Sequence, residues 1–141
     1  MPLTRQEISE AMDRWNQAWA DHDLGGVMDL FHEDVFFEHW TGTEVKGSKA
    51  LREAWTPWFT NHGGFRFTTE DLFIDEKQQK LLYQWTLDWP SVEQGREGRP
   101  ERRRGVDVIH FQDGKIINKL TYAKTAIEIE GKKMRLSVPA L

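Results

Sequence analysis

Side chains alternate in character through Lys80-Leu81-Leu82-Tyr83-Gln84-Trp85-Thr86-Leu87-Asp88-Trp89. Large apolar side chains stand at every second position, from Leu81 to Trp89. Successive side chains of a strand point to opposite faces, so this stretch predicts a strand with one clearly buried face. The chain therefore contains a sheet that covers a core.

Neighbouring segments supply partners for this strand. The turn Glu76-Lys77-Gln78-Gln79 precedes it, and Asp113-Gly114 is the strongest short hairpin signal in the chain. The residues around Gly131-Lys132-Lys133 predict one more small hairpin. We expect antiparallel strands over 65–75, 80–89, 101–112 and 115–124, with the sheet as a whole spanning about 65–138. The long connection 90–100 is rich in Gly, Pro and charge, which makes it a candidate mobile rim or lid.

The residues before the sheet have the period of helices. Thr4-Arg5-Gln6-Glu7 is a capping box that starts a helix over about 5–20. Asp23 caps a short second helix with an apolar set that runs to Phe31. Ser48 caps a third helix, and the helical part of the chain spans about 5–62. Two breaks are also expected: Pro57 kinks or breaks the third helix, and His62-Gly63-Gly64 ends it. Between the second and third helices, Val35-Phe36-Phe37 begins a short strand that Thr41-Gly42-Thr43 breaks.

Length and composition are those of one globular domain over residues 1–141. The chain is 38% hydrophobic and 30% charged, with a net charge of -4. This charge argues against nucleic acid as a partner. The one basic cluster, Arg102-Arg103-Arg104, is flanked by Glu97 and Glu101 and is interpreted as a solvated strand face. There are no cysteines, which excludes disulfides and thiolate chemistry. No stretch is apolar enough for a signal core or a membrane span, so we expect a cytoplasmic protein.

Helices packed on one face of a curved antiparallel sheet give an α+β fold with a pocket between the two layers. The most direct functional expectation is that this pocket binds a small hydrophobic molecule.

Four stretches resemble a known family. They are Trp15-Asn16-Gln17-Ala18-Trp19-Ala20-Asp21-His22-Asp23-Leu24, Leu30-Phe31-His32-Glu33-Asp34-Val35, Gly47-Ser48-Lys49-Ala50-Leu51-Arg52 and Gly105-Val106-Asp107-Val108-Ile109-His110-Phe111-Gln112-Asp113-Gly114-Lys115-Ile116. Together they resemble SnoaL-like, nuclear transport factor 2-like domains, over about residues 8–124. The resemblance implies a cystatin-like cone, in which a curved antiparallel sheet wraps three N-terminal helices around an apolar cavity. It also implies a homodimer that packs through the sheet. The superfamily includes isomerases, cyclases, dehydratases, epoxide hydrolases and non-catalytic binders, so it leaves the activity open.

Asp107 is the first candidate for chemistry. It shares its side of the predicted strand with Gly105, Ile109 and Phe111. A carboxyl group among apolar neighbours has a raised pKa and can stay protonated as a hydrogen-bond donor. Asp107 also matches the position of such an acid in the ketosteroid isomerases that the family includes. The alternative is a structural ion pair between Asp107 and a nearby Lys or Arg.

His39 is the candidate base. It matches the position of the aspartate base of the steroid isomerases, where this chain has His39-Trp40 instead of Asp-Pro. Histidine titrates near neutral pH and can accept a proton. The alternative is a histidine at the pocket mouth without chemistry. Trp15 matches the position of the isomerases' oxyanion-hole tyrosine, but an indole N–H donates a hydrogen bond without transferring a proton. We expect Trp15 to pack in the core or to form a cavity wall.

The register of the last long hairpin decides whether Lys119 or Tyr122 lies on the same face of the sheet as Asp107. A two-residue turn at Asp113-Gly114 places Leu120 opposite Asp107 with Tyr122 on the same face, whereas a bulge brings Lys119 inward instead. The family's pocket pattern favours the bulge. An inward Lys119 would neutralise Asp107, or it would hold an enolate or carboxylate of a ligand.

Aromatic residues are expected to form the pocket walls. The candidate ligand-binding residues are Trp15, Trp19, Trp40, Trp55, Trp58, Phe59, Phe67, Trp85 and Ile109, with Trp89 as a further wall. His22-Asp23 and His32-Glu33-Asp34 lack the spacing of a zinc site, and no glycine-rich phosphate loop is present. We therefore expect neither a metal nor a cofactor.

Three functional hypotheses follow. The first is a cofactor-free isomerase-like or cyclase-like enzyme that moves a proton on a hydrophobic carbonyl compound, with Asp107, His39, and Lys119 or Tyr122 as its groups. The second is a non-catalytic binder of hydrophobic ligands. The third is a dimerisation domain whose cavity is filled by its own tryptophans.

Overall fold

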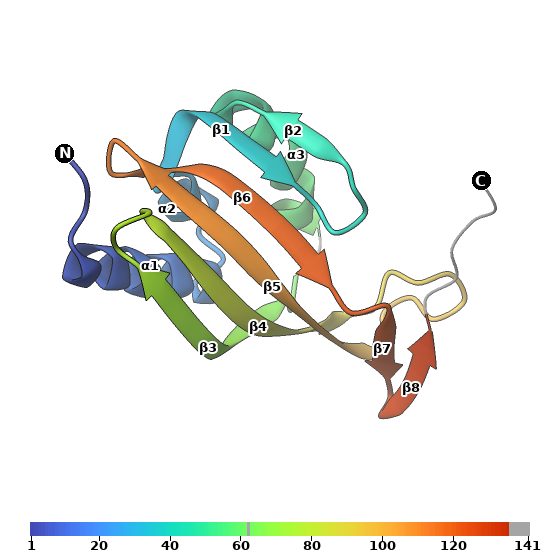
Figure 1. Cartoon of the computed structure of the whole chain (residues 1–141). Coiled ribbons are helices and arrows are strands. Elements are labelled where there is room, and N and C mark those ends of the chain that lie inside the picture. Colours follow the sequence, from blue (N-terminus) through green and yellow to red (C-terminus); the bar gives the residue numbers. More distant parts are fainter. Residues whose placement is uncertain (62, 136–141) are drawn as a thin grey trace.

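The computed structural model describes residues 1–61 and 63–135, and Figure 1 shows their arrangement. Within these residues the elements follow in the order α1 (Arg5–Ala20), α2 (Leu24–Met28), β1 (Phe31–Glu38), β2 (Glu44–Lys46), α3 (Ser48–Asn61), β3 (Arg66–Asp75), β4 (Lys80–Pro90), β5 (Pro100–Gln112), β6 (Lys115–Ala123), β7 (Ala126–Ile129) and β8 (Lys132–Arg135). The expected strands and the small terminal hairpin are all present. The expected end of the third helix at His62 and the expected sheet residues 136–138 lie outside the described residues.

The strands form one sheet in the order β2-β1-β6-β5-β4-β3, and β7 pairs with both β5 and β8. The pairs are antiparallel except for β1 with β6, which run parallel. The sheet is thus mixed and not purely antiparallel as expected. Parallel pairing is possible here because β2, α3 and three further strands separate β1 from β6 along the chain, which gives a connection of ample length.

The sheet curls, and the three helices lie on one side of it (Figure 1). α1 begins with the predicted capping box, in which Thr4 accepts from the Glu7 amide and Glu7 accepts from the Thr4 amide. Its apolar stripe, from Ile8 to Trp19, is buried against the sheet. The fold is therefore the expected α+β cone, with its core between the helices and the curled sheet.

Three local features differ from the expectation. Phe31 begins β1 and does not end α2, and the three-residue strand β2 follows the predicted break. α3 continues through Pro57. Both Pro57 and Glu53, whose carbonyl loses its helical partner, are exposed, so water can bond the freed carbonyl oxygen and the helix need not break.

A bulge near the β5–β6 turn sets which residues face the helices. The register of the two strands shifts between His110 and Phe111, so that Asp107 pairs with Thr121 and Ile109 pairs with Lys119. Lys119 and Thr121 are buried on the inner face, while Tyr122 points outward and is 52% exposed. The bulged register is thus the one observed.

The basic cluster of β5 is only partly solvated. Arg102 and Arg104 are exposed, but Arg103 is on the inner face and is buried. The expectation of a solvated face was wrong for Arg103, because strand alternation turns the middle of three consecutive residues inward.

Candidate functional site

A cavity of about 390 Å³ lies between the helices and the inner face of the sheet. All seven tryptophans of the chain line it, together with Phe37, Phe67 and Tyr83. The rings leave this space unfilled, which contradicts the hypothesis that the tryptophans fill it. Such a shape, with apolar walls and a few polar groups, is typical of sites for small molecules.

A row of polar side chains crosses the cavity floor. Thr121 on β6, Asp107 on β5 and Tyr83 on β4 are direct cross-strand neighbours, and all three are buried. The Thr121 hydroxyl donates to Asp107 Oδ1 over 2.7 Å. The Tyr83 hydroxyl donates to Asn16 Oδ1 of α1 over 3.1 Å and accepts from Thr69 over 3.3 Å. Burial raises the pKa of Tyr83, and the charge of Asp107 adds to this rise, while the hydrogen bond from Thr69 opposes it.

Lys119 brings a positive charge into this aromatic cavity. Its ammonium lies 3.2 Å from Asp107 Oδ1 and donates to Thr121 Oγ1 over 2.7 Å. The Nζ atom also lies 4.9 Å from the centre of the Phe37 ring. Burial lowers the pKa of Lys119, and the ion pair with Asp107 opposes that shift. An ammonium has three donors, so Lys119 keeps one for a bound molecule after these two contacts.

The ion pair changes the role expected for Asp107. Its Oδ1 atom contacts both the Lys119 ammonium and the Thr121 hydroxyl. The geometry therefore corresponds to the ion-pair alternative, in which Asp107 holds Lys119 and Thr121 in place.

His39 follows β1 and lines the same cavity. Its ring packs on Trp40 at 4.1 Å between centres and on Phe37 at 5.9 Å, and no hydrogen bond holds its ring nitrogens within the described residues. Burial lowers the pKa of His39 to about 4, and the charges of Lys119 and Arg103 add to the shift. At neutral pH His39 is therefore an uncharged imidazole with a free lone pair that can accept a proton.

The structure brings most of the candidate residues to one cavity, and it separates a few from it. Asp107, His39 and Lys119 line the cavity, as do Trp15, Trp19, Trp40, Trp55, Trp58, Phe67, Trp85 and Trp89. Tyr122 does not, because the bulge turns it to the outer face. Ile109 and Phe59 are not among its lining residues: Ile109 is fully buried, and the Phe59 ring packs on Trp19 at 5.0 Å between centres.

Sequence reasoning missed Thr121, Tyr83 and Asn16. Thr121 lies two residues after Lys119 and therefore on the same face of the strand. Knowledge of the bulged register would have been enough to predict that Thr121 faces the cavity. Tyr83 was assigned to the buried face of its strand, but its hydrogen bond to Asn16 depends on how α1 packs on the sheet. No local sequence pattern predicts how α1 packs on the sheet.

Two other kinds of site are not seen in residues 1–61 and 63–135. No cluster of three or more potential metal ligands occurs there. None of the helices in that part of the chain has the length and apolar character that crossing a membrane requires.

Solved structures share the architecture of this chain. A nuclear transport factor 2-like protein of unknown function from Mesorhizobium loti is 24% identical, with a TM-score of 0.68 over 88% of this chain and 97% of that one. A proposed polyketide cyclase from Xanthomonas campestris pv. campestris is 15% identical, with a TM-score of 0.71 over 85% and 92%. A proposed ketosteroid isomerase from Kribbella flavida is 16% identical, with a TM-score of 0.68 over 87% and 82%. At these identities the likeness shows the fold alone.

The family is shown by sequence. No curated protein matches the chain. The model of the SnoaL-like domain, however, matches residues 12–119, which include the second half of α1, all of α2 and α3, His39 and the β5–β6 hairpin through Lys119. The chain therefore belongs to the SnoaL-like domain family, with a nuclear transport factor 2-like fold.

Proposed function

We propose that this protein is a cofactor-free enzyme that moves a proton on a small hydrophobic carbonyl compound bound in the cavity. The observation that carries the proposal is that His39, whose ring nitrogens have no hydrogen-bond partner in residues 1–61 and 63–135, and a buried Lys119 ammonium line one unfilled aromatic cavity. The names of two similar structures, a proposed isomerase and a proposed cyclase, are compatible with such chemistry.

His39 acts as the base in this mechanism. Its imidazole removes a proton from the carbon next to the carbonyl group, and the electron pair of that C–H bond moves onto the carbonyl oxygen. The resulting imidazolium returns the proton to a carbon or an oxygen of the same molecule. No redox partner is needed, because the reaction only relocates a proton and an electron pair.

Lys119 stabilises the negative charge that develops on the oxygen. A fixed ammonium in a site of low polarity interacts strongly with an enolate, because little water screens the two charges. Asp107 and Thr121 are positioning residues: they hold the ammonium by an ion pair and a hydrogen bond. The tryptophan walls exclude water and bind the apolar body of the molecule.

Exchange of hydrogen for deuterium tests the proposal. We would incubate the protein with β-tetralone, a small bicyclic ketone, in buffered heavy water and follow loss of the α-proton signal by NMR. Exchange above the buffer rate is expected to rise with pH through about 4, where His39 loses its proton, and then to level off. His39→Gln should lower the enzymatic rate by about a hundred-fold or more, and Lys119→Met should also lower it.

Tyr122→Phe is the matched control, because this residue lies on the outer face. This variant should catalyse the exchange of hydrogen for deuterium in β-tetralone at the same rate as the unmodified protein. Exchange at the buffer rate, or full exchange by His39→Gln, would contradict proton transfer. A second candidate, a non-catalytic binder, is favoured by the walls of seven tryptophans and would show β-tetralone binding without exchange.

A further inference from the structure

The mouth of the cavity is formed by three exposed side chains. Among the residues that line the cavity, Thr43, Ala54 and Val92 are exposed. Thr43 precedes β2, Ala54 belongs to α3, and Val92 belongs to the connection between β4 and β5. Val92 is 53% exposed although it contacts the cavity, so it lies between the cavity and solvent.

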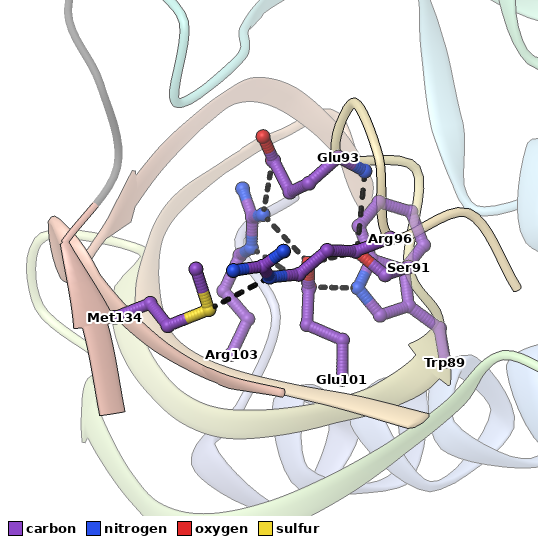
Figure 2. Close-up of polar contacts among 7 residues, drawn as sticks. All are labelled: Trp89, Ser91, Glu93, Arg96, Glu101, Arg103 and Met134. Carbon is purple, nitrogen blue, oxygen red and sulfur yellow. Dashed lines mark hydrogen bonds and ion pairs between the residues drawn. The ribbon is translucent and has the colours of Figure 1, made fainter. Parts of the chain in front are cut away.

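Both neighbours of Val92 are anchored to the body of the protein (Figure 2). Ser91 is buried, and its hydroxyl donates to Glu101 Oε1 over 3.1 Å. The same hydroxyl accepts from the Glu93 amide over 3.1 Å. The Glu93 carboxylate accepts from Arg103 Nη2 over 3.1 Å. A short segment with Val92 at its centre is thus fixed at both ends.

The residues that anchor this segment are themselves buried and joined to each other. The side chains of Glu101 and Arg103 are 0% and 4% exposed, and two hydrogen bonds of 3.2 Å join them. The Trp89 indole also donates to Glu101 (Figure 2). The Arg103 guanidinium lies 4.8 Å from the Trp40 ring and 5.6 Å from the Trp89 ring, both of which are cavity walls. Of the two carboxylates on Arg103, Glu93 is partly exposed at 37%, so its bond opens to water at the lower cost.

The rest of this connection is joined to the protein more sparsely. Two glycines, Gly95 and Gly98, follow the anchored segment in the chain. Their φ values are 83° and 81°, a backbone conformation that glycine adopts without steric cost. Beyond Glu93, the described residues show one side-chain hydrogen bond, from Arg96 to the Met134 sulfur on β8 (Figure 2), and one ion pair of 3.3 Å between the exposed side chains of Arg99 and Glu130. Backbone hydrogen bonds also join Ser91 to Gly98 and Arg99. Rotation about the glycines can therefore move Val92 and Glu93 relative to the anchored Ser91 once the Glu93 bond opens.

We propose that Ser91–Glu93 is the gate segment of the cavity, in which Val92 closes the mouth and the Glu93–Arg103 ion pair holds it closed. Val92 thereby determines how fast, and up to what size, small molecules enter. This inference rests on the ligand-binding part of the proposed function and is independent of proton transfer.

Removal of one charge tests the gate. Glu93→Gln removes the ion pair, yet Arg103 keeps Glu101, so no buried charge is left unpaired and the fold is maintained. Glu97→Gln is the matched control, because Glu97 is exposed on the same connection and has no ion pair in the described residues. Stopped-flow quenching of tryptophan fluorescence by β-tetralone measures both rate constants. We expect Glu93→Gln to raise the association and dissociation rate constants at least three-fold, and Glu97→Gln to change neither.

A second variant tests the role of Val92 itself. Val92→Ala should raise both rate constants, and the double variant Val92→Ala/Glu93→Gln should be no faster than the faster single variant, because both changes open the same mouth. Rate constants in Glu93→Gln and Val92→Ala equal to those of Glu97→Gln would overturn the gate while leaving the cavity as a binding site. Absence of any quenching in the unmodified protein would overturn both the gate and the binding on which it rests.

Discussion

Gly105 makes room for one wall of the cavity. A Cβ atom at this position would lie 2.3 Å from the Tyr122 carbonyl oxygen and 2.5 Å from the Trp85 ring. Because the first neighbour is backbone, the strand itself would have to shift. We predict that Gly105→Ala lowers the free energy of unfolding by about 1–3 kcal/mol and weakens β-tetralone binding by displacing Trp85. Urea unfolding and fluorescence quenching measure the two effects.

Gly63→Ala is the control for this prediction. A Cβ at Gly63 meets nothing within 4 Å, so the loss of glycine alone is tested there. Equal stability of the Gly105→Ala and Gly63→Ala variants would show that the close contacts at Gly105 relax freely.

The lowered pKa of His39 also predicts that the free energy of unfolding depends on pH. Its pKa is about 4 in the folded protein and near 6.5 in the unfolded chain, so the unfolded chain binds more protons between these values. The stabilising contribution of neutral His39 is fully present above pH 6.5 and is lost as the pH falls toward 4. After allowance for partial exposure, the loss is on the order of 1–2 kcal/mol. Urea unfolding at pH 7 and at pH 4 should show this component in the unmodified protein only; an identical loss in His39→Gln would contradict the prediction.

At the scale of residues, the sequence predicted which positions carry polar groups but not how they pair. Alternation along the strand was enough to place Asp107 on the inner face. The partner of Asp107 depends on a bulge at Ile117 of β6, opposite His110 and Phe111, whose presence no local signal distinguishes from a regular ladder. The resemblance to the family, and not the alternation, favoured Lys119 over Tyr122.

At the scale of elements, the end of the β4–β5 ladder depends on a buried ion pair. Glu101 on β5 accepts from Arg103 and from Trp89, which is its cross-strand neighbour on β4. Removing Glu101 leaves Arg103 with the partly exposed Glu93 as its remaining carboxylate, so the buried guanidinium loses its fully buried partner. Loss of one partner from a buried pair typically costs about 3–5 kcal/mol. We predict that Glu101→Leu is less stable toward urea than the double variant Glu101→Leu/Arg103→Met, although the double variant carries the additional substitution. A double variant that is the less stable of the two would show that the charge pair is not the cause.

The helices and strands were predicted from the sequence more completely than the other features of this structure. The capping box at Thr4 and the period of α1 set the first helix to its observed bounds, because both signals are local. The parallel pairing of β1 with β6 was not predicted, because it joins segments about eighty residues apart. Strand β2 was missed for a different reason: its three residues bury no side chain fully and so show no alternation to detect.

At the scale of the whole molecule, the outer face of the sheet carries an uncovered apolar row. Phe73, Leu82, Val108 and Leu120 are successive cross-strand neighbours on β3, β4, β5 and β6. Phe73 is 59% exposed, and the other three are half-buried. We propose that a second copy of the chain covers this row, as the expected homodimer through the sheet requires.

Sedimentation velocity tests the proposed dimer. Val108→Lys places a charge at the centre of the row and should shift the protein from dimer to monomer. Thr68→Lys, at an exposed position near the start of β3, should leave the dimer intact. A monomeric unmodified protein would contradict the proposal.

The bulge between β5 and β6 has a consequence for how such a cavity changes over generations. Its extra residue decides whether Lys119 and Thr121 or Leu120 and Tyr122 face the ligand. Loss of a single codon near the Asp113-Gly114 turn would therefore exchange an ammonium and a hydroxyl for an aliphatic side chain and a phenol, without a substitution at any of these four positions. A lineage with this hairpin can alter the chemistry of its cavity by a change in length, and the turn is a place where directed evolution should sample deletions as well as point mutations.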